Sequence, residues 1–170
     1  MNLQSDAAAF EVATLDDALR ERLAASGLEP RLVAVDDSDA FAHWFQVVAR
    51  GFLDGERSDE EVAASRERGG HRRRTGIFDP SAPMPDAPVA TIASWIGELT
   101  VPGGRGIRSC AISAVTVAPT HRRRGIARAM LEGELRTAVA AGIPIAMLTV
   151  SESQLYGRYG FAPAAASANP

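Results

Sequence analysis

Apolar and polar residues recur along the chain with the period of an α-helix in several segments. The clearest is Arg124–Ala141, whose apolar residues share one face and which Gly142 follows as a stop signal. The same period predicts a short helix that ends near Gly27. It also predicts helices over about Ala40–Phe52 and Asp59–Arg68. The apolar period therefore predicts these four helices.

Short polar motifs mark the starts of two of these helices. Asp37, Ser38 and Asp39 offer side-chain caps in front of residue 40. Ser58, with Glu61 three residues later, has the pattern of a capping box. We therefore expect both helices to begin at these residues.

Apolar and β-branched runs between the helices predict strands. They lie at about residues 31–35, 74–78, 89–99, 107–117 and 144–150. The turn Pro102–Gly104 joins the third and fourth runs into an antiparallel pair. The run Pro144–Val150 is apolar throughout, which is typical of a strand buried on both faces. With a short helix in Ser151–Tyr159 and a weak strand in Phe161–Ala166, the order of elements predicts a mixed α/β domain around one sheet.

Length and composition favour a single folded domain. The chain has 170 residues, of which 46% are hydrophobic and 23% charged, so one buried core is expected and two are not. The longest apolar runs are too short to span a bilayer, and Met1–Phe10 lacks the pattern of a signal peptide. We therefore expect a cytoplasmic protein with no membrane partner.

Charge and residue usage exclude several classes of function. The formal net charge of -3 argues against nucleic-acid binding, and no aromatic residues interleave the arginine triplets at 72–74 and 122–124. All 18 basic residues are arginine, which excludes lysine nucleophiles. Cys110 is the single cysteine and fits a small buried side chain. His43 and His71 have no metal-like partners, so no metal is expected.

An arginine-rich loop joins a predicted strand to the clearest helix. The strand ends at Val117, and Gly125, Ile126 and Ala127 open the helix. The first turn of a helix leaves backbone N–H groups unpaired, and the helix dipole adds positive charge there. The small Gly125 and Ala127 would let phosphate oxygens approach these groups. The pattern therefore suits a phosphate site, with a solvated loop before an ordinary helix as the alternative.

A second segment, Leu155–Phe161, follows the last apolar strand. A tyrosine at this place holds its hydroxyl near the carboxyl end of the sheet, where open α/β sheets bind ligands. Tyr156 is therefore a candidate proton donor, and half-buried packing is the alternative.

Taken together, the two segments resemble the GCN5-related N-acetyltransferase (GNAT) superfamily. The residues R-x-x-G-x-A at 122–127 and L-Y-x-x-x-G-F at 155–161 carry this resemblance. Residues 99–104, 117–125 and 151–160 resemble the Eis-like (enhanced intracellular survival) aminoglycoside acetyltransferases within that superfamily. The resemblance implies a GNAT fold, with a central mixed, mostly antiparallel sheet flanked by helices. It implies one GNAT domain over residues 1–170, the N-terminal part of a longer Eis-like protein.

The resemblance implies acetyl-CoA as the co-substrate. The main chain at Val115 and Val117 would pair with the pantetheine amides, and the Val117 amide would polarise the thioester carbonyl. The N–H groups of residues 123–128 would hold the pyrophosphate. The matching positions are Val115, Thr116, Val117, Arg123, Arg124, Gly125, Ile126, Ala127, Arg128, Ser151 and Glu152.

The reaction implied is direct attack of a neutral primary amine on the thioester. Tyr156 matches the general acid, which protonates the departing thiolate. In Eis-like enzymes the base is the carboxylate at the end of a large second region, whereas this sequence ends at Pro170. We therefore expect either a fragment that binds acetyl-CoA but acetylates poorly, or a short relative that uses water or another carboxylate. The alternative function is a non-catalytic acyl-CoA-binding or regulatory module.

The resemblance also suggests the acceptor. Eis-like pockets are acidic and suit aminoglycoside- or polyamine-like amines, and Asp54 matches an acidic pocket residue, with a solvated loop as the alternative. Eis-like enzymes are hexamers, so a homo-oligomer is implied. Trp44 and Phe45 fit core positions, His121 fits a surface loop, and Arg72–Arg74 fits an exposed turn.

Overall fold

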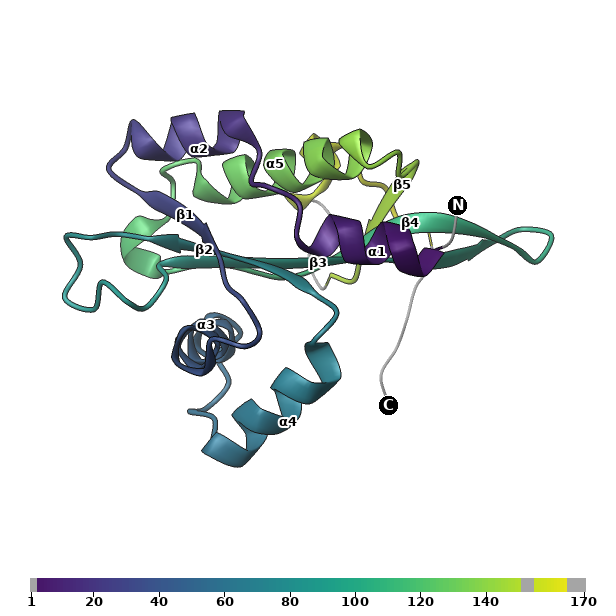
Figure 1. Ribbon diagram of the computed structural model, residues 1–170. Coiled ribbons are helices and arrows are strands. Elements are labelled where there is room, and N and C mark those ends of the chain that lie inside the picture. The colour runs from purple at the N-terminus through teal and green to yellow at the C-terminus, as the bar shows by residue number, and fades with distance from the viewer. Residues whose placement is uncertain (1–2, 151–154, 165–170) are drawn as a thin grey trace.

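A five-stranded sheet forms the centre of the computed structural model, which describes residues 3–150 and 155–164 (Figure 1). The strands follow the chain order, and they are β1 (Glu29–Leu32), β2 (Arg73–Phe78), β3 (Ala90–Val101), β4 (Arg105–Val117) and β5 (Ile145–Leu148). The first four pair antiparallel, and β5 pairs parallel to β4. The expected mixed, mostly antiparallel sheet is therefore confirmed.

Helices cover both faces of this sheet. They are α1 (Leu3–Glu11), α2 (Asp17–Ala24), α3 (Ser38–Gly51), α4 (Asp59–Gly69) and α5 (Ile126–Ala140). In Figure 1, α2 and α5 lie above the sheet, and α3 and α4 lie below it. The larger core joins α1, α2 and α5 to the sheet, and includes Phe10, Leu19 and Met130. The smaller core lies under α3, where Trp44 packs on Phe78 and Ala114.

The two helix starts that the sequence predicts are confirmed. The Asp37 carboxylate accepts a hydrogen bond from the Ala40 amide (3.0 Å) at the start of α3. At the start of α4, the Ser58 hydroxyl accepts from the Glu61 amide (3.3 Å), and the Glu61 carboxylate accepts from the Ser58 amide (2.9 Å). The capping box thus satisfies two amides that the helix leaves unpaired.

Three expectations about the ends of the chain need correction. Helix α1 was not anticipated, because its nine residues carry little apolar periodicity. Strand β5 is not buried on both faces, since it pairs with β4 on one side only within the described residues and Ile145 is 40% exposed. Residues 161–164 form no strand, in keeping with Pro163, which lacks the amide that pairing needs. Of Ser151–Tyr159, only 155–159 is described, and it contains a 3-10 turn at Gly157–Tyr159.

The arginine triplet at 72–74 is not the exposed turn that the sequence suggested. Arg73 is 1% exposed and forms an ion pair with Glu134 of α5 (3.4 Å), itself 2% exposed. The Glu134 carboxylate also accepts a hydrogen bond from Ser94 (2.7 Å), and Arg73 donates to the Thr14 carbonyl (3.2 Å). This network ties the sheet to α5 and to the segment between α1 and α2. A charge can be buried here because each group has partners.

Removing one partner of this network should destabilise the fold. Glu134→Ala leaves the Arg73 guanidinium buried without its carboxylate, and we expect a loss of about 3 to 5 kcal/mol in the free energy of unfolding. Glu132→Ala is the matched control on the same helix, because its pair with Arg128 (3.0 Å) is exposed and contributes about 0.5 kcal/mol. Urea unfolding measures both. Equal losses in the two variants would contradict the assignment.

Candidate active site

A cleft of about 610 Å³ opens where β4 ends and α5 begins. The end of β4 and the loop that continues from it into α5 meet there with the segment after β5, and single residues of α2 and α3 complete the lining. The lining residues are Arg22, Gly51, Val115, Thr116, Val117, His121, Arg122, Arg123, Gly125, Ile126, Ala127, Arg128, Leu155, Tyr156, Arg158 and Tyr159. Most positions that the resemblance singled out are therefore brought together. Arg124 is not among the lining residues, and Ser151 and Glu152 lie outside the described residues.

Strand β4 leaves its neighbour β5 before it reaches the cleft. The two strands pair only from Ser109 to Ile112 of β4, which then continues to Val117. A bulge lies in between, because Ala114 and Val115 together face the single residue Ile92 of β3. Ala114 has a left-handed backbone (φ 53°), which is uncommon for a residue with a side chain. The bulge thus bends β4 where its edge begins to line the cleft.

The backbone of Val117 faces away from β3. The next amide, that of Ala118, donates to the Val89 carbonyl of the segment before β3 (2.8 Å). Because peptide groups alternate sides along a strand, the Val117 amide and carbonyl point the other way. The Val117 carbonyl accepts a hydrogen bond from Arg122 Nε (3.3 Å). This edge can therefore offer main-chain groups to an extended ligand.

The first turn of α5 ends in the same cleft. Its N-cap, Gly125, is left-handed (φ 78°), and no side chain of the described residues caps the helix. Arg123, two residues earlier, is also left-handed (φ 64°). The first turn of any helix has amides without intrahelical acceptors, and here the small residues Gly125 and Ala127 lie beside them. The arrangement suits an anion, since the helix dipole and several guanidinium groups add positive charge.

Arg22 of α2 was missed from the sequence and lines this cleft. A Cβ atom on Gly125 would lie 2.7 Å from Arg22 Nη2, so the guanidinium reaches the start of α5. Arg22 lies 3.9 Å from the Glu132 carboxylate, which also pairs with Arg128 (3.0 Å). No local motif marks Arg22, because only the packing of α2 on α5 brings it there.

His121 is not on the surface, as the sequence suggested, but is buried at the wall of the cleft. Its Nε2 lies 3.0 Å from the Asp79 carboxylate, and its Nδ1 lies 2.8 Å from the Thr120 hydroxyl. Hydrogen bonds from Ser81 and then from His121 lower the pKa of Asp79 to about 2. His121 therefore fixes the arginine-rich loop to the segment after β2.

Tyr156 lines the cleft just before the 3-10 turn Gly157–Tyr159. Its ring meets the ring of Phe161 edge-on, with the centroids 6.2 Å apart. Tyr156, Tyr159 and Phe161 are all half-buried against the larger core. Packing therefore holds the Tyr156 ring beside the end of β4.

Helix α3 approaches the floor of the cleft at its last residue. A Cβ atom on Gly51 would lie 2.5 Å from Thr116 Cβ, so glycine is required for this contact. The Thr91 hydroxyl donates to the Ala114 carbonyl (2.8 Å), and the Thr116 hydroxyl lies 2.7 Å from Thr91 Oγ1. These bonds hold the bulge from the β3 side.

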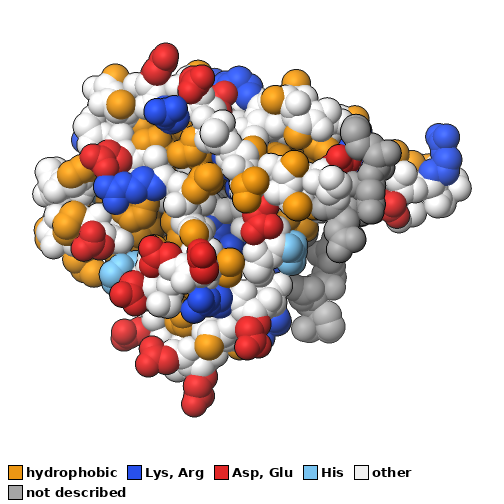
Figure 2. All heavy atoms as spheres, in the orientation of Figure 1, with side chains coloured by type: hydrophobic (Ala, Val, Ile, Leu, Met, Phe, Trp, Pro, Cys, Tyr) orange, Lys and Arg blue, Asp and Glu red, His pale blue; other side chains and the backbone are white. Residues whose placement is uncertain are grey.

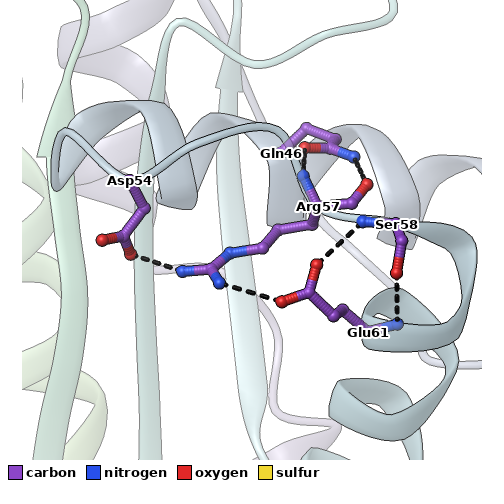
Figure 3. A network of polar contacts seen from close by, with 5 residues as sticks. All are labelled: Gln46, Asp54, Arg57, Ser58 and Glu61. Carbon is purple, nitrogen blue, oxygen red and sulfur yellow. Dashed lines mark hydrogen bonds and ion pairs between the residues drawn. The ribbon is translucent and has the colours of Figure 1, made fainter.

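Asp54 is not among the residues that line the cleft. Its carboxylate pairs with Arg57 (2.6 Å), whose guanidinium also binds Glu61 (3.1 Å; Figure 3). Gln46 holds the Arg57 backbone at both its carbonyl (2.7 Å) and its amide (3.0 Å). Hydrogen bonds from the Ser58 backbone and from Arg57 lower the pKa of Glu61. The Asp54 carboxylate is therefore already neutralised by a fixed cation.

Residues 3–150 and 155–164 contain no group of three or more His, Cys, Asp or Glu side chains that could hold a metal ion. Burial raises the pKa of the Cys110 thiol to about 12, so it stays protonated at neutral pH. Within the same residues, each helix falls short of the length and apolar character needed to cross a membrane.

The sequence is similar to known acetyltransferases. The model of the acetyltransferase (GNAT) domain family matches residues 33–164. An uncharacterized N-acetyltransferase of Streptomyces griseus is 42% identical over 139 residues, which are 81% of this chain and 32% of that protein. The chain thus spans about a third of the length of the curated relatives that it matches.

Solved structures with a similar fold include the following two. Eis1 from Mycobacterium abscessus has a TM-score of 0.58 and 26% identity, and the match covers 77% of this chain and 31% of that one. A predicted acetyltransferase from Clostridium acetobutylicum, crystallised with acetyl-CoA, has a TM-score of 0.65 and 17% identity, over 84% and 96% of the two chains.

Acid should release the contact between Asp79 and His121. Because the pKa of Asp79 is lowered from 3.8 to about 2, its contribution to stability is complete above about pH 4 and is lost as the pH falls through about 2. Urea unfolding between about pH 2 and 6 measures this, and Asp79→Asn should lack that part of the pH dependence. Asp86→Asn, in the same loop and exposed, is the control. An Asp79→Asn variant that follows the wild-type profile would contradict the assignment.

Proposed function

Since this chain belongs to the GNAT family of acetyltransferases, we propose that it transfers an acetyl group from acetyl-CoA to a primary amine. The observation that carries the proposal is the meeting of the free edge of β4, the uncapped start of α5 and Tyr156 in one cleft. Each of these matches one part of the donor: the pantetheine amides, the pyrophosphate and the leaving thiolate, respectively.

Different residues of the cleft bind different parts of acetyl-CoA. The amides of the first turn of α5 bind the pyrophosphate, and Arg22, Arg123 and Arg128 supply the surrounding positive charge. The free edge of β4 at Val115 and Val117 pairs with the pantetheine arm. The missing Cβ of Gly125 leaves room for the Arg22 guanidinium at the start of the helix.

The chemistry then follows from the same positions. The amine nitrogen attacks the thioester carbonyl carbon, the new C–N bond forms, and the C–S bond breaks. The Val117 amide stabilises the negative charge that develops on the carbonyl oxygen. Tyr156 gives its proton to the thiolate, and the amine loses a proton to a base. We propose that this base lies outside residues 1–170, as the short match to the curated relatives suggests.

The resemblance to Eis-like enzymes extends the proposal to aminoglycoside- or polyamine-like acceptors and to a hexamer. In that case Asp54 would bind a substrate ammonium group. Such a group would first have to displace Arg57, which holds Asp54 at 2.6 Å. The acceptor that we propose is therefore a primary amine, and Asp54 is not assigned to its binding. A non-catalytic acyl-CoA-binding module is the second candidate, and turnover separates the two.

A carboxylate at residue 125 should prevent acetyl-CoA binding. Gly125→Asp places negative charge at the start of α5, and we expect its Kd for acetyl-CoA, measured by calorimetry, to rise at least about tenfold more than that of Gly125→Asn. The two variants share size and left-handed backbone strain, so they differ in charge alone. Equal affinities in the two variants would remove the phosphate assignment.

Loss of the Tyr156 hydroxyl should slow turnover without weakening donor binding. For Tyr156→Phe we expect a fall of about 100-fold or more in the rate of coenzyme A release with a primary amine, at an unchanged Kd for acetyl-CoA. Tyr159→Phe, in the same cleft, is the control and should stay near the wild-type rate. A Tyr156→Phe variant with the parental rate would show that this tyrosine is not the acid. Because the proposed base lies outside residues 1–170, turnover is measured on the full-length protein. If that protein binds acetyl-CoA and transfers nothing, the binding-module alternative holds.

A further inference from the structure

A second groove, of about 230 Å³, lies on the opposite face of the sheet from α5, between α3, α4 and β2. One wall is aromatic, with Phe41 and Phe45 stacked at 6.0 Å and 19°. Phe52, at the end of α3, is 57% exposed and extends the wall. Phe41 is buried and Phe45 half-buried, so Phe52 supplies the exposed aromatic surface, which favours a ligand with an apolar body.

The rest of the groove is cationic. Arg68 of α4 and Arg72 and Arg74 around the start of β2 line it, and no carboxylate does. None of these three forms an ion pair within the part of the chain that the structure describes, whereas Arg57 and Arg73 nearby each have a carboxylate partner. Three guanidinium groups without counter-ions therefore surround one small groove.

Each buried guanidinium in the groove is held in place by neutral groups. Arg74 lies over the Phe41 ring (5.0 Å) and donates hydrogen bonds to the carbonyls of Arg72 (2.8 Å) and Gly69. Burial and the nearby Arg72 lower the pKa of Arg74, and Glu11 offsets this in part. Arg72 lies over the Trp95 ring (4.4 Å). Its Nε atom is buried and has no hydrogen-bond partner among the described residues. A buried donor without an acceptor is costly, and an anionic ligand would remove that cost.

The groove adjoins the cleft of the candidate active site. Gly51 of α3 lines the cleft and Phe52 lines the groove, while in β4 Val115 lines the cleft and Ala114 lines the groove. The two cavities therefore meet at the bulge of β4. For the proposal below, the free end of a molecule held in the groove has to reach past this bulge to the place where the proposed thioester would lie.

We propose that this groove is the acceptor subsite and that it binds an anionic group on the amine that is acetylated. The inference rests on the proposed function, and it names the class of acceptor as an amine with an apolar or aromatic body and a carboxylate or similar anion. It departs from the polycationic acceptors that Asp54 suggested, because three guanidinium groups repel ammonium groups. Asp and Glu side chains gather on the outer surface on the α3 and α4 side (Figure 2), but they do not line the groove.

Binding of a matched pair of amines tests the subsite without requiring turnover. The pair is para-(aminomethyl)benzoate and the corresponding benzamide, which differ in one charge at nearly equal shape, titrated into the whole chain by calorimetry. We expect the carboxylate to bind at least about tenfold more tightly, and Arg68→Gln and Arg72→Gln to remove most of this preference. Arg66→Gln is the control, because Arg66 lies on α4 but outside the groove. Melting temperatures show that each variant is folded.

Equal affinity for the two amines, or a preference that survives both groove substitutions, would overturn the subsite. Tighter binding of spermidine than of the carboxylate would also overturn it, in favour of the acidic outer surface. Transfer is then assayed with acetyl-CoA. The subsite predicts a KM about tenfold lower for the carboxylate than for the benzamide. For the groove variants it predicts a higher KM for the carboxylate than in the wild type, with little change in kcat. If the chain shows the binding preference and the full-length protein, which would carry the proposed base, acetylates neither amine, the proposed function is contradicted and the anion subsite is still supported.

Discussion

The divergence of β4 from β5 is the constraint on which the rest of the site depends. Pairing with β5 ends at Ile112, and the bulge at Ala114 and Val115 follows directly in β4. A bulge bends the strand that contains it, and the edge of β4 beyond this bend lines the cleft. The bend is held from one side by Thr91 and from below by the contact of Gly51 with Thr116. One irregular pair of residues thus creates both the cleft above the sheet and the floor of the groove below it.

The same bulge separates two chemically different surfaces. On one face, backbone amides and partly exposed guanidinium groups surround the beginning of α5. On the other, aromatic rings and guanidinium groups fixed by carbonyls and ring faces surround Ala114. The first surface suits a flexible phosphate chain, whereas the second suits a small rigid molecule with a fixed charge. A transfer reaction needs two partners to meet from different directions, and the two faces of β4 provide that.

Local signals predicted most of the fold and about half of the site. The capping motif at Ser58 and Glu61, the turn at Pro102–Gly104 and the periodicity of α5 each act over a few residues, so the sequence reveals them. Arg22 and the buried Arg73 were missed because their environment is created by helices far away in the chain. A basic residue in an arginine triplet looks solvated until its partner, Glu134, is known to lie 61 positions later.

The Arg73 network also connects the amino-terminal segment of the chain to the sheet and to α5. Arg73 donates to the carbonyls of Ala13 and Thr14, which precede the first strand, as well as to Glu134 of α5. A chain shortened to begin at β1 would keep the whole sheet, yet it would strip a buried cation of two of its acceptors. The amino-terminal helices are therefore part of the electrostatic balance of the interior, and the smallest stable form of this domain must include them.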